Sequence, residues 1–357
     1  MARGMSSWIS SLSRDTRAEP RPKGSGRAVL IVRAAWRIVA STMTSNNEYP
    51  RIAVMGAGAV GSFFGGMLAR AGAPVTLIGR AAHAEAIAAH GLTIESFRFP
   101  KPERIRVDAA TGAEAVRGAQ IVLLCVKTLD TESAAQAIAP HLAPDAVVVS
   151  MQNGVDNVAR IRAASGIDAL GAAVYVAAEM AAPGRVKHTG RGDLIVGPFP
   201  ESSHRPAAIE GVAQCFACAG MPCRVAEDIR GPLWMKMLMN CACNAISALG
   251  RSRYGRMAAR AEVREIMRYA IDEAVAVARA EAIPLPVENF VETGWKLAET
   301  MSNATSSTAQ DLARGKKTEI DSLNGYIVRR GAALGVPTPV NQTLHGLIKL
   351  LEESAEA

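Results

Sequence analysis

Three polar side chains recur at four-residue spacing within one apolar stretch of the chain. Lys236, Asn240 and Asn244 lie in residues 232–250, which otherwise hold mainly leucine, methionine, alanine and cysteine. The stretch begins with a proline, which suits the first turn of a helix, and ends with a glycine, which suits its termination. At about 100° per residue the three polar residues span roughly 80°, so they share one face of the predicted helix.

Lys236 is the only charged residue in this stretch. A solvated helix face usually holds more glutamate, lysine and arginine than this one. A buried lysine is rare, and burial lowers its pKa from about 10.4, so its presence here needs a functional or structural explanation. Such a lysine can stabilise negative charge that develops on a keto oxygen and then donate a proton to it. The two asparagines can orient a substrate without adding charge. From this segment alone, a functional stripe and a solvated face both stay open.

A strand, a glycine loop and a helix follow one another near residue 51. Residues 52–55 are apolar, and phenylalanine, methionine and leucine at helical spacing follow over residues 63–68. In a G-x-G-x-x-G loop the first glycine permits a tight turn, the second lets a pyrophosphate approach the backbone, and the third lets the helix pack on the strand. The predicted cofactor loop consists of Gly56, Ala57, Gly58, Ala59, Val60 and Gly61.

The end of the next predicted strand indicates which dinucleotide is preferred. An NAD-binding protein usually places a carboxylate there for the ribose 2′-hydroxyl. Here the strand 74–78 is followed by Gly79 and Arg80. A glycine leaves room, and a guanidinium can pair with a 2′-phosphate, so we expect NADPH as cofactor and Arg80 as its ligand. The alternative is an ordinary surface arginine.

Two further apolar strands, 120–127 and 145–154, end in polar residues. The first ends at Lys127 and the second at Gln152-Asn153-Gly154. Ligands of open α/β sheets bind beyond the carboxyl ends of the strands. Strand-like pieces follow at 169–176, 185–189 and 193–196, and from about residue 231 the pattern is helical. We therefore predict an α/β N-terminal Rossmann-like doubly wound domain followed by an all-α C-terminal domain.

The chain of 357 residues, 49% hydrophobic and 20% charged, is long enough for two domains. We expect a disordered extension over residues 1–50, an NADP-binding domain over 51–226, and a helical substrate and catalytic domain over 227–357. The Ser- and Arg-rich extension resembles a transit peptide only loosely, and we favour Met43 as the true start of the protein, with residues 1–42 an upstream over-read.

Charge and cysteine usage exclude several classes of protein. Residues 1–42 hold eight Lys/Arg against two acidic residues, whereas the rest of the chain holds 32 against 31. A basic nucleic-acid face is therefore not expected, and no apolar run is long enough to span a membrane. The six cysteines lie mostly in apolar segments, so we expect free thiols, no metal and a cytoplasmic location.

Two polar runs occur late in the helical half, at 306–311 and 317–325. Thr318 and Asp321 have the spacing of a capping box, which is the interpretation we favour for Asp321 within a helix over 318–334. For Glu319 the pattern does not distinguish a surface carboxylate from one that binds a ligand.

Taken together, these segments resemble the 2-dehydropantoate 2-reductase (ketopantoate reductase) family over roughly residues 51–350. The resemblance is carried by the glycine loop and the motifs Cys125-Val126-Lys127, Gln152-Asn153-Gly154, Trp234-x-Lys236-x-x-x-Asn240-x-x-x-Asn244, Ser306-Ser307-x-x-Gln310-Asp311, Thr318-Glu319-Ile320-Asp321-x-x-Asn324-Gly325 and Gly335-Val336-Pro337-Thr338-Pro339.

The resemblance implies NADPH-dependent reduction of 2-dehydropantoate to (R)-pantoate, a step toward pantothenate and coenzyme A. By position Lys236 matches the general acid of the family, and Glu319 its substrate-binding carboxylate. Substrate contacts are implied for Asn240, Asn244, Ser307 and Asn153. Lys127, Asn153 and Glu319 are implied at the junction with the cofactor. The implied partner is a small-molecule 2-oxo acid; a homodimer stays open as the assembly.

Two positions depart from the family pattern. Ala304 replaces an asparagine just before the serine run, and Tyr254 stands in the region where another asparagine is expected. The reaction class is therefore better defined than the substrate. The alternatives are an NADPH-dependent reductase of another 2-oxo acid on the same scaffold and a non-catalytic NADP-binding sensor, which would need no acid at position 236.

Overall fold

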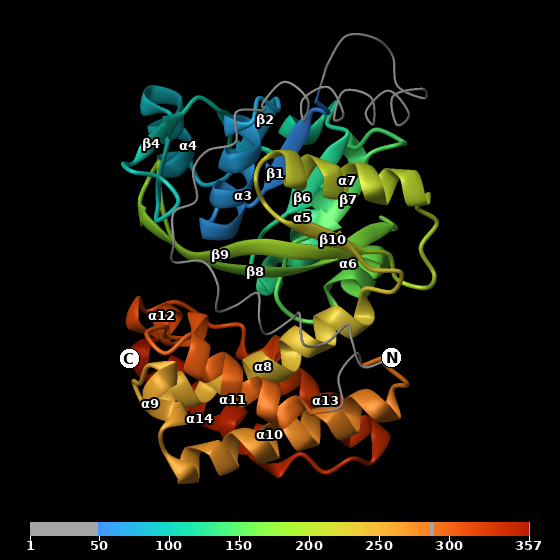
Figure 1. Ribbon diagram of the computed structural model, residues 1–357. Helices are drawn as coiled ribbons and strands as arrows, with labels where there is room; N and C mark the ends of the chain where they lie inside the picture. Colours follow the sequence, from blue (N-terminus) through green and yellow to red (C-terminus); the bar gives the residue numbers. More distant parts are fainter. Residues whose placement is uncertain (1–48, 286–288, 357) are drawn as a thin grey trace, which may run out of the picture.

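A computed structural model describes residues 49–285 and 289–356, and Figure 1 shows a sheet half above a helical half. The sheet half comprises the strands and the helices between them up to Val225, and the helical half begins at Arg230. The predicted fold class is confirmed. The disorder predicted for the N-terminal extension falls almost entirely outside the described residues.

One ten-stranded sheet lies within the described part of the chain. Its strands are β1 (Ile52–Met55), β2 (Val75–Ile78), β3 (Leu92–Ser96), β4 (Glu103–Ile105), β5 (Asp108–Ala110), β6 (Ile121–Leu124), β7 (Val147–Ser150), β8 (Ala169–Ala182), β9 (Arg185–Gly197) and β10 (Cys223–Val225). Their order is β4-β3-β9-β8-β7-β6-β1-β2-β5, with β10 paired to β9. The strands β7, β6, β1, β2 and β5 run parallel, so their carboxyl ends share one edge.

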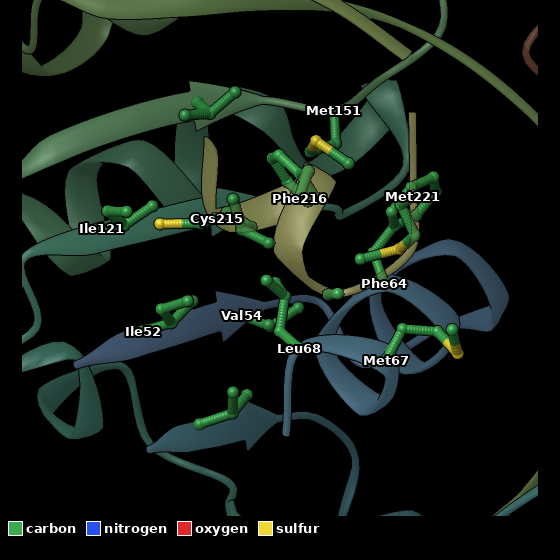
Figure 2. Packing of buried hydrophobic residues seen from close by; sticks show 14 of the residues in the cluster. Ile52, Val54, Phe64, Met67, Leu68, Ile121, Met151, Cys215, Phe216 and Met221 are labelled. Carbon is green, nitrogen blue, oxygen red and sulfur yellow. The ribbon is translucent and has the colours of Figure 1, made fainter. Parts of the chain in front are cut away.

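Helices cover both faces of this sheet, as expected for a doubly wound fold. Alternate residues of β1 face opposite sides: Ile52 and Val54 join the apolar cluster of Phe64 and Phe216, whereas Ala53 joins a second cluster. Figure 2 shows the first cluster, where sulfur and aromatic side chains fill the space beside β1. The first face is covered by α3 (Ala59–Arg70), α4 (Ala81–His90) and α7 (Pro206–Cys218), and the second by α5 (Thr131–Ile138) and α6 (Asn157–Ser165).

The helical half packs against the long strands β8 and β9, which run between it and the rest of the sheet (Figure 1). Ala173 of β8 and Ile195 of β9 share an apolar cluster with Leu233 and Trp234. The helices are α8 (Arg230–Leu249), α9 (Tyr254–Ala258), α10 (Ala261–Ala280), α11 (Phe290–Thr300), α12 (Ser307–Ala313), α13 (Asn324–Leu334) and α14 (Pro339–Glu356). No helix among the described residues is long and apolar enough to cross a membrane.

The two strand pieces predicted at 185–189 and 193–196 form one strand. The pairing with β8 shifts between Tyr175 and Val176, which face Asp193 and Arg191, so that Gly192 is an extra residue. Arg191 and Gly192 have φ values of +58° and +114°. A β-bulge of this kind lets a strand continue through residues that interrupt its alternation.

The segment 318–323 is not the start of a helix, which was a wrong prediction. A short 3₁₀ turn, Ile320–Ser322, precedes α13. The capping box is not formed either, because Glu352 accepts the Thr318 N–H at 2.7 Å. Asp321 instead lies 2.7 Å from His345 Nε2 and 3.0 Å from Lys349 Nζ. Long-range partners therefore replace the local capping contacts.

Candidate active site

The polar stripe predicted in residues 232–250 lies on α8. Lys236 and Asn240 are partly buried, and Asn244 is 2% exposed. The apolar residues of the same helix, among them Leu233 and Met237, pack into the core of the helical half. The helix thus holds the three polar side chains together because its apolar residues fix it in the core.

The Lys236 side chain makes no hydrogen bond and no ion pair with the residues that the structure describes. Its pKa is lowered from 10.5 to about 8, chiefly because burial disfavours the charged form. The positive charge of Arg191 lowers this pKa further, and the negative charge of Glu319 opposes both effects. Lys236 is therefore a cation that releases its proton more readily than an ordinary lysine does, and its ammonium has no ion-pair partner among the described residues.

Arg191 was not identified from the sequence as a site residue. Its carbonyl oxygen lies 2.9 Å from His188 Nε2, and its guanidinium pairs with Asp193 Oδ1 and Oδ2 at 2.9 and 2.7 Å. The same guanidinium lies 4.3 Å above the centre of the Tyr175 ring. These contacts hold a non-glycine residue in the left-handed region, and such positions concentrate at functional sites. The run of residues 190–193, Gly-Arg-Gly-Asp, is consistent with a β-bulge, but nothing in its pattern predicts that Arg191 lies close enough to Lys236 to affect its pKa.

Asn244 connects the stripe to the two positions that depart from the family pattern. The Tyr254 hydroxyl lies 3.3 Å from Asn244 Oδ1, and Asn244 Nδ2 lies 3.5 Å from Ser307 Oγ. The Tyr254 N–H donates to the Ala304 carbonyl at 3.0 Å, so the two departures are neighbours. Tyr254 is 7% exposed, and burial raises its pKa, which leaves its hydroxyl protonated as a donor.

Ser307, which is exposed, is placed by the serine before it. Ser306 caps α12 by accepting the Ala309 N–H at 3.0 Å, and its hydroxyl also donates to the Asn244 carbonyl at 3.0 Å. Ser306 itself is 1% exposed. In the Ser306-Ser307 pair, the first serine is thus structural and the second is accessible.

Glu319 joins the helical half to the sheet half. Its Oε1 accepts the Thr128 N–H at 3.1 Å, and its Oε2 accepts from Asn153 Nδ2 at 2.8 Å. The Thr128 hydroxyl lies 3.0 Å from both Glu319 Oε1 and the Asn153 carbonyl oxygen, so its one hydrogen serves either acceptor. The structure therefore brings Glu319 into contact with Asn153.

Lys127 also crosses between the halves, but it is paired. Its Nζ lies 2.7 Å from Asp311 Oδ2 and 3.1 Å from the Lys317 carbonyl oxygen. Burial raises the pKa of Asp311, and the contact with Lys127 partly offsets that rise. Lys127 and Lys236 are therefore held in opposite ways, the first in an ion pair and the second without one.

The glycine loop is shaped to receive a dinucleotide phosphate. Gly56 has a φ of +105°, and a Cβ there would lie 2.5 Å from the Val126 nitrogen; a Cβ at Gly61 would lie 2.3 Å from the Gly56 oxygen. A Cβ at Gly58 would instead project into open space before the first turn of α3, which holds no acidic residue. An anion at this helix N-terminus would meet unpaired N–H groups, so the cradle fits a nicotinamide dinucleotide.

Arg80 lies at the start of α4, beyond the carboxyl end of β2, and is exposed. Its carbonyl oxygen accepts the His83 and Ala84 N–H groups at 3.0 Å, whereas its side chain makes no hydrogen bond or ion pair with the described residues. A Cβ at Gly79 would lie 2.9 Å from the Ala57 side chain, so a larger residue would collide with the glycine loop. The geometry leaves the Arg80 guanidinium available beside that loop without identifying its ligand.

The six cysteines are free, and no group of three or more His, Cys, Asp or Glu residues within the described ranges could hold a metal ion. Burial raises the pKa of the Cys215 and Cys223 thiols to about 12, so both are protonated at neutral pH.

Comparisons with known proteins match both halves of the chain. The family model "Ketopantoate reductase PanE/ApbA" matches residues 52–201, and the corresponding C-terminal model matches residues 228–352. A 2-dehydropantoate 2-reductase of Pyrococcus abyssi is 34% identical over 302 residues, which is 84% of this chain and 97% of that protein. The enzyme of Halobacterium salinarum is 32% identical and covers 85% of this chain and 99% of its own length.

Solved structures give the same assignment. A crystal structure of a PanE/ApbA family ketopantoate reductase from Ralstonia eutropha is 47% identical, with a TM-score of 0.79 over 86% of this chain and 100% of that chain. A D-mandelate dehydrogenase with NADH and anilino(oxo)acetate is 25% identical, with a TM-score of 0.78 and the same coverage. The chain is an oxidoreductase that belongs to the ketopantoate reductase family.

Proposed function

We propose that this protein reduces the 2-keto group of 2-dehydropantoate to (R)-pantoate with NADPH. The observation that carries the proposal is Lys236, a partly buried ammonium without an ion pair whose pKa is lowered to about 8. A group of this kind is protonated at neutral pH and still releases its proton readily. The alternative of a non-catalytic sensor gives no reason for such a lysine.

NADPH, when bound in the glycine cradle, supplies the hydride. Lys236 faces the keto oxygen, stabilises the charge that develops on it and then donates the proton. Arg191 favours that donation because its positive charge lowers the pKa of Lys236. Glu319 opposes this effect and keeps the lysine protonated before the reaction.

The remaining side chains orient the substrate. Asn240 and Asn244 lie on the Lys236 face of α8, and Ser307 extends that polar surface from α12. Glu319 and Asn153 hold the junction with the cofactor, where Lys127 supplies a fixed positive charge. We infer that residues 51–226 form the cofactor domain and residues 227–357 the substrate domain, with these side chains between them.

Cofactor preference is part of the proposal. We infer that Arg80 pairs with the 2′-phosphate of NADPH and that Gly79 leaves room for the ribose. The contacting set comprises the glycine loop from Gly56 to Gly61, Arg80, Lys127, Asn153 and Glu319. The D-mandelate dehydrogenase is described with NADH, which makes the NADH control necessary.

The test is a turnover assay that follows the absorbance of NADPH or NADH with a panel of 2-oxo acids. We expect the highest kcat/KM with 2-dehydropantoate and NADPH, and the Lys236→Ala protein serves as the inactive control. A higher kcat/KM with an aromatic 2-oxo acid would assign another substrate, and that outcome would be traced first to Tyr254 and Ala304. Absence of turnover with every 2-oxo acid would instead support the alternative of a non-catalytic NADP-binding sensor.

Assembly and location complete the proposal. We infer a homodimer, which sedimentation of the purified chain would distinguish from a monomer. The free thiols fit a reducing compartment, and we place the enzyme in the cytoplasm.

A further inference from the structure

The loop that carries Glu319 is held by the end of the last helix. Glu352 of α14 accepts on Oε1 the Thr318 N–H at 2.7 Å and the Thr318 hydroxyl at 2.6 Å. Its Oε2 lies 2.9 Å from Lys349 Nζ. Glu352 is 8% exposed and Thr318 2%, so these contacts are made inside the protein.

Glu352 is charged in this setting. Burial would raise its pKa, but the hydrogen bonds from Thr318 and Lys349 outweigh that effect and the pKa lies below its usual value. Hydrogen bonds to an ionised carboxylate are shorter and stronger than those between neutral groups. The Thr318 backbone is therefore fixed more firmly than an ordinary loop residue.

Three consecutive residues of this loop are anchored, two of them by the sheet half and the middle one by α14. Lys127 donates to the Lys317 carbonyl at 3.1 Å, and Glu352 holds Thr318. The Glu319 carboxylate then accepts from the backbone and side chain of the sheet half. Of these anchors, the one at Thr318 comes from within the helical half, so it is kept if the two halves move relative to each other.

We propose that Glu352 is a positioning residue of the active site, which fixes Thr318 and thereby sets the place of the Glu319 carboxylate. The proposal rests on the substrate-binding role that we propose for Glu319. Both oxygens of Glu352 are used by Thr318 and Lys349, so Glu352 acts through Glu319 and not on the substrate.

Kinetics of full-length variants test this role. Glu352→Ala leaves a buried N–H without its acceptor, and we expect the KM for 2-dehydropantoate to rise at least about tenfold. The kcat and the dissociation constant of NADPH should change less than about threefold. Glu352→Gln keeps the Oε1 acceptor and should restore most of the affinity. Glu353→Ala, an exposed carboxylate next in the chain, is the matched control and should equal the wild type.

A double variant separates positioning from general destabilisation. If Glu352 acts through Glu319, Glu319→Gln with Glu352→Ala should be no worse in KM than Glu319→Gln alone. Additive losses would overturn the proposal. Thr318→Val removes the hydroxyl contacts with Glu352 and with the Ile320 N–H but keeps the backbone contact with Glu352, so it should raise the KM by a smaller factor. An unchanged KM in both Thr318→Val and Glu352→Ala would also overturn the proposal.

Hydrogen exchange of the ligand-free protein tests the anchor without any turnover. The Thr318 amide should exchange slowly in the wild type and at least about tenfold faster in Glu352→Ala, with unchanged exchange in the core strand β1. Equal protection of Thr318 in both proteins would overturn the proposal. Failure of the wild type to reduce 2-dehydropantoate would instead refute the proposed function and leave this result interpretable.

Discussion

The sheet half contributes mainly backbone to the site, whereas the helical half contributes mainly side chains. In the sheet half the cofactor cradle is made of backbone, and Gly56 matters because its φ of +105° and its contact with Val126 exclude a side chain. In the helical half the site is made of side chains on α8, and their backbone is ordinary helix. The first kind of site depends on the conformation of a few adjacent residues, whereas the second depends on what surrounds each side chain.

This difference predicts how variants of the two halves should behave. Changes to side chains of α8 and its neighbours should alter the chemistry or the substrate KM and leave cofactor binding nearly intact. Changes beside the glycine loop should alter the choice of dinucleotide. Arg191 is the exception, because it belongs to the sheet half and acts on the lysine of the helical half.

The largest effect is expected for Lys236→Ala. Loss of a general acid usually costs about a hundredfold or more in rate, so kcat should fall by at least about that factor. NADPH affinity by titration should hardly change. A near-normal kcat in a folded protein would refute the role of Lys236 and of the whole α8 stripe.

The same variant has a thermodynamic signature. Because burial lowers the pKa of Lys236 from 10.5 to about 8, the unfolded chain binds more protons than the native one between these pH values. The stability of the wild type should therefore rise as pH increases through this window, and Lys236→Ala should lack that rise. At pH 7 the variant should melt at the same or a higher temperature, since a desolvated charge is gone. A lower melting temperature would indicate a structural lysine.

The second effect is expected for Glu319→Gln. The KM for 2-dehydropantoate should rise about tenfold or more because a carboxylate that would accept a substrate hydroxyl is lost. NADPH binding should change little, because glutamine keeps the size and the hydrogen-bonding capacity that Glu319 offers at the cofactor junction. Glu262→Gln on the exposed side of α10 is the matched control. An unchanged KM would show that Glu319 only makes a structural contact between the two halves.

Local patterns were sufficient for the parts of the molecule whose determinants are adjacent in the chain. The glycine loop lies within six residues and the α8 stripe within nine, and both were predicted from spacing alone. The parallel order of β1, β2, β6 and β7 follows from alternating strands and helices. Each of these features can be predicted without knowledge of the rest of the chain.

Long-range contacts explain what the sequence analysis missed. Thr128 and Glu319, 191 residues apart, share a hydrogen bond, and Thr318 and Glu352 are 34 residues apart. The capping box does not form because Glu352 accepts the Thr318 N–H and Lys349 donates to Asp321. Arg191 was missed because a charge acts through space, and no spacing in β9 reports a lysine on α8.

The third prediction concerns the cofactor side alone. Arg80→Asp removes the proposed partner of the 2′-phosphate and adds an acceptor for a ribose hydroxyl. The ratio of kcat/KM with NADPH to that with NADH should fall about tenfold or more, while the KM for the 2-oxo acid stays within about twofold. Arg117→Asp, at an exposed arginine whose guanidinium lies 3.1 Å from His141 Nδ1, controls for the added negative charge. A constant ratio would make Arg80 a surface residue.

The smallest effect, on Arg191, tests whether the two halves are electrostatically separate. Lys236 must be protonated to donate, so kcat/KM of the wild type should fall as pH rises through about 8. Arg191→Asn suits the left-handed backbone and removes the positive charge, which should raise the pKa of Lys236 and shift this fall to higher pH. Arg191→Lys keeps the charge and should leave the profile in place. Glu319→Gln removes a negative charge and should shift the fall in the opposite direction. If neither Arg191→Asn nor Glu319→Gln moves the profile, the group that titrates is not Lys236, and the proton must come from elsewhere.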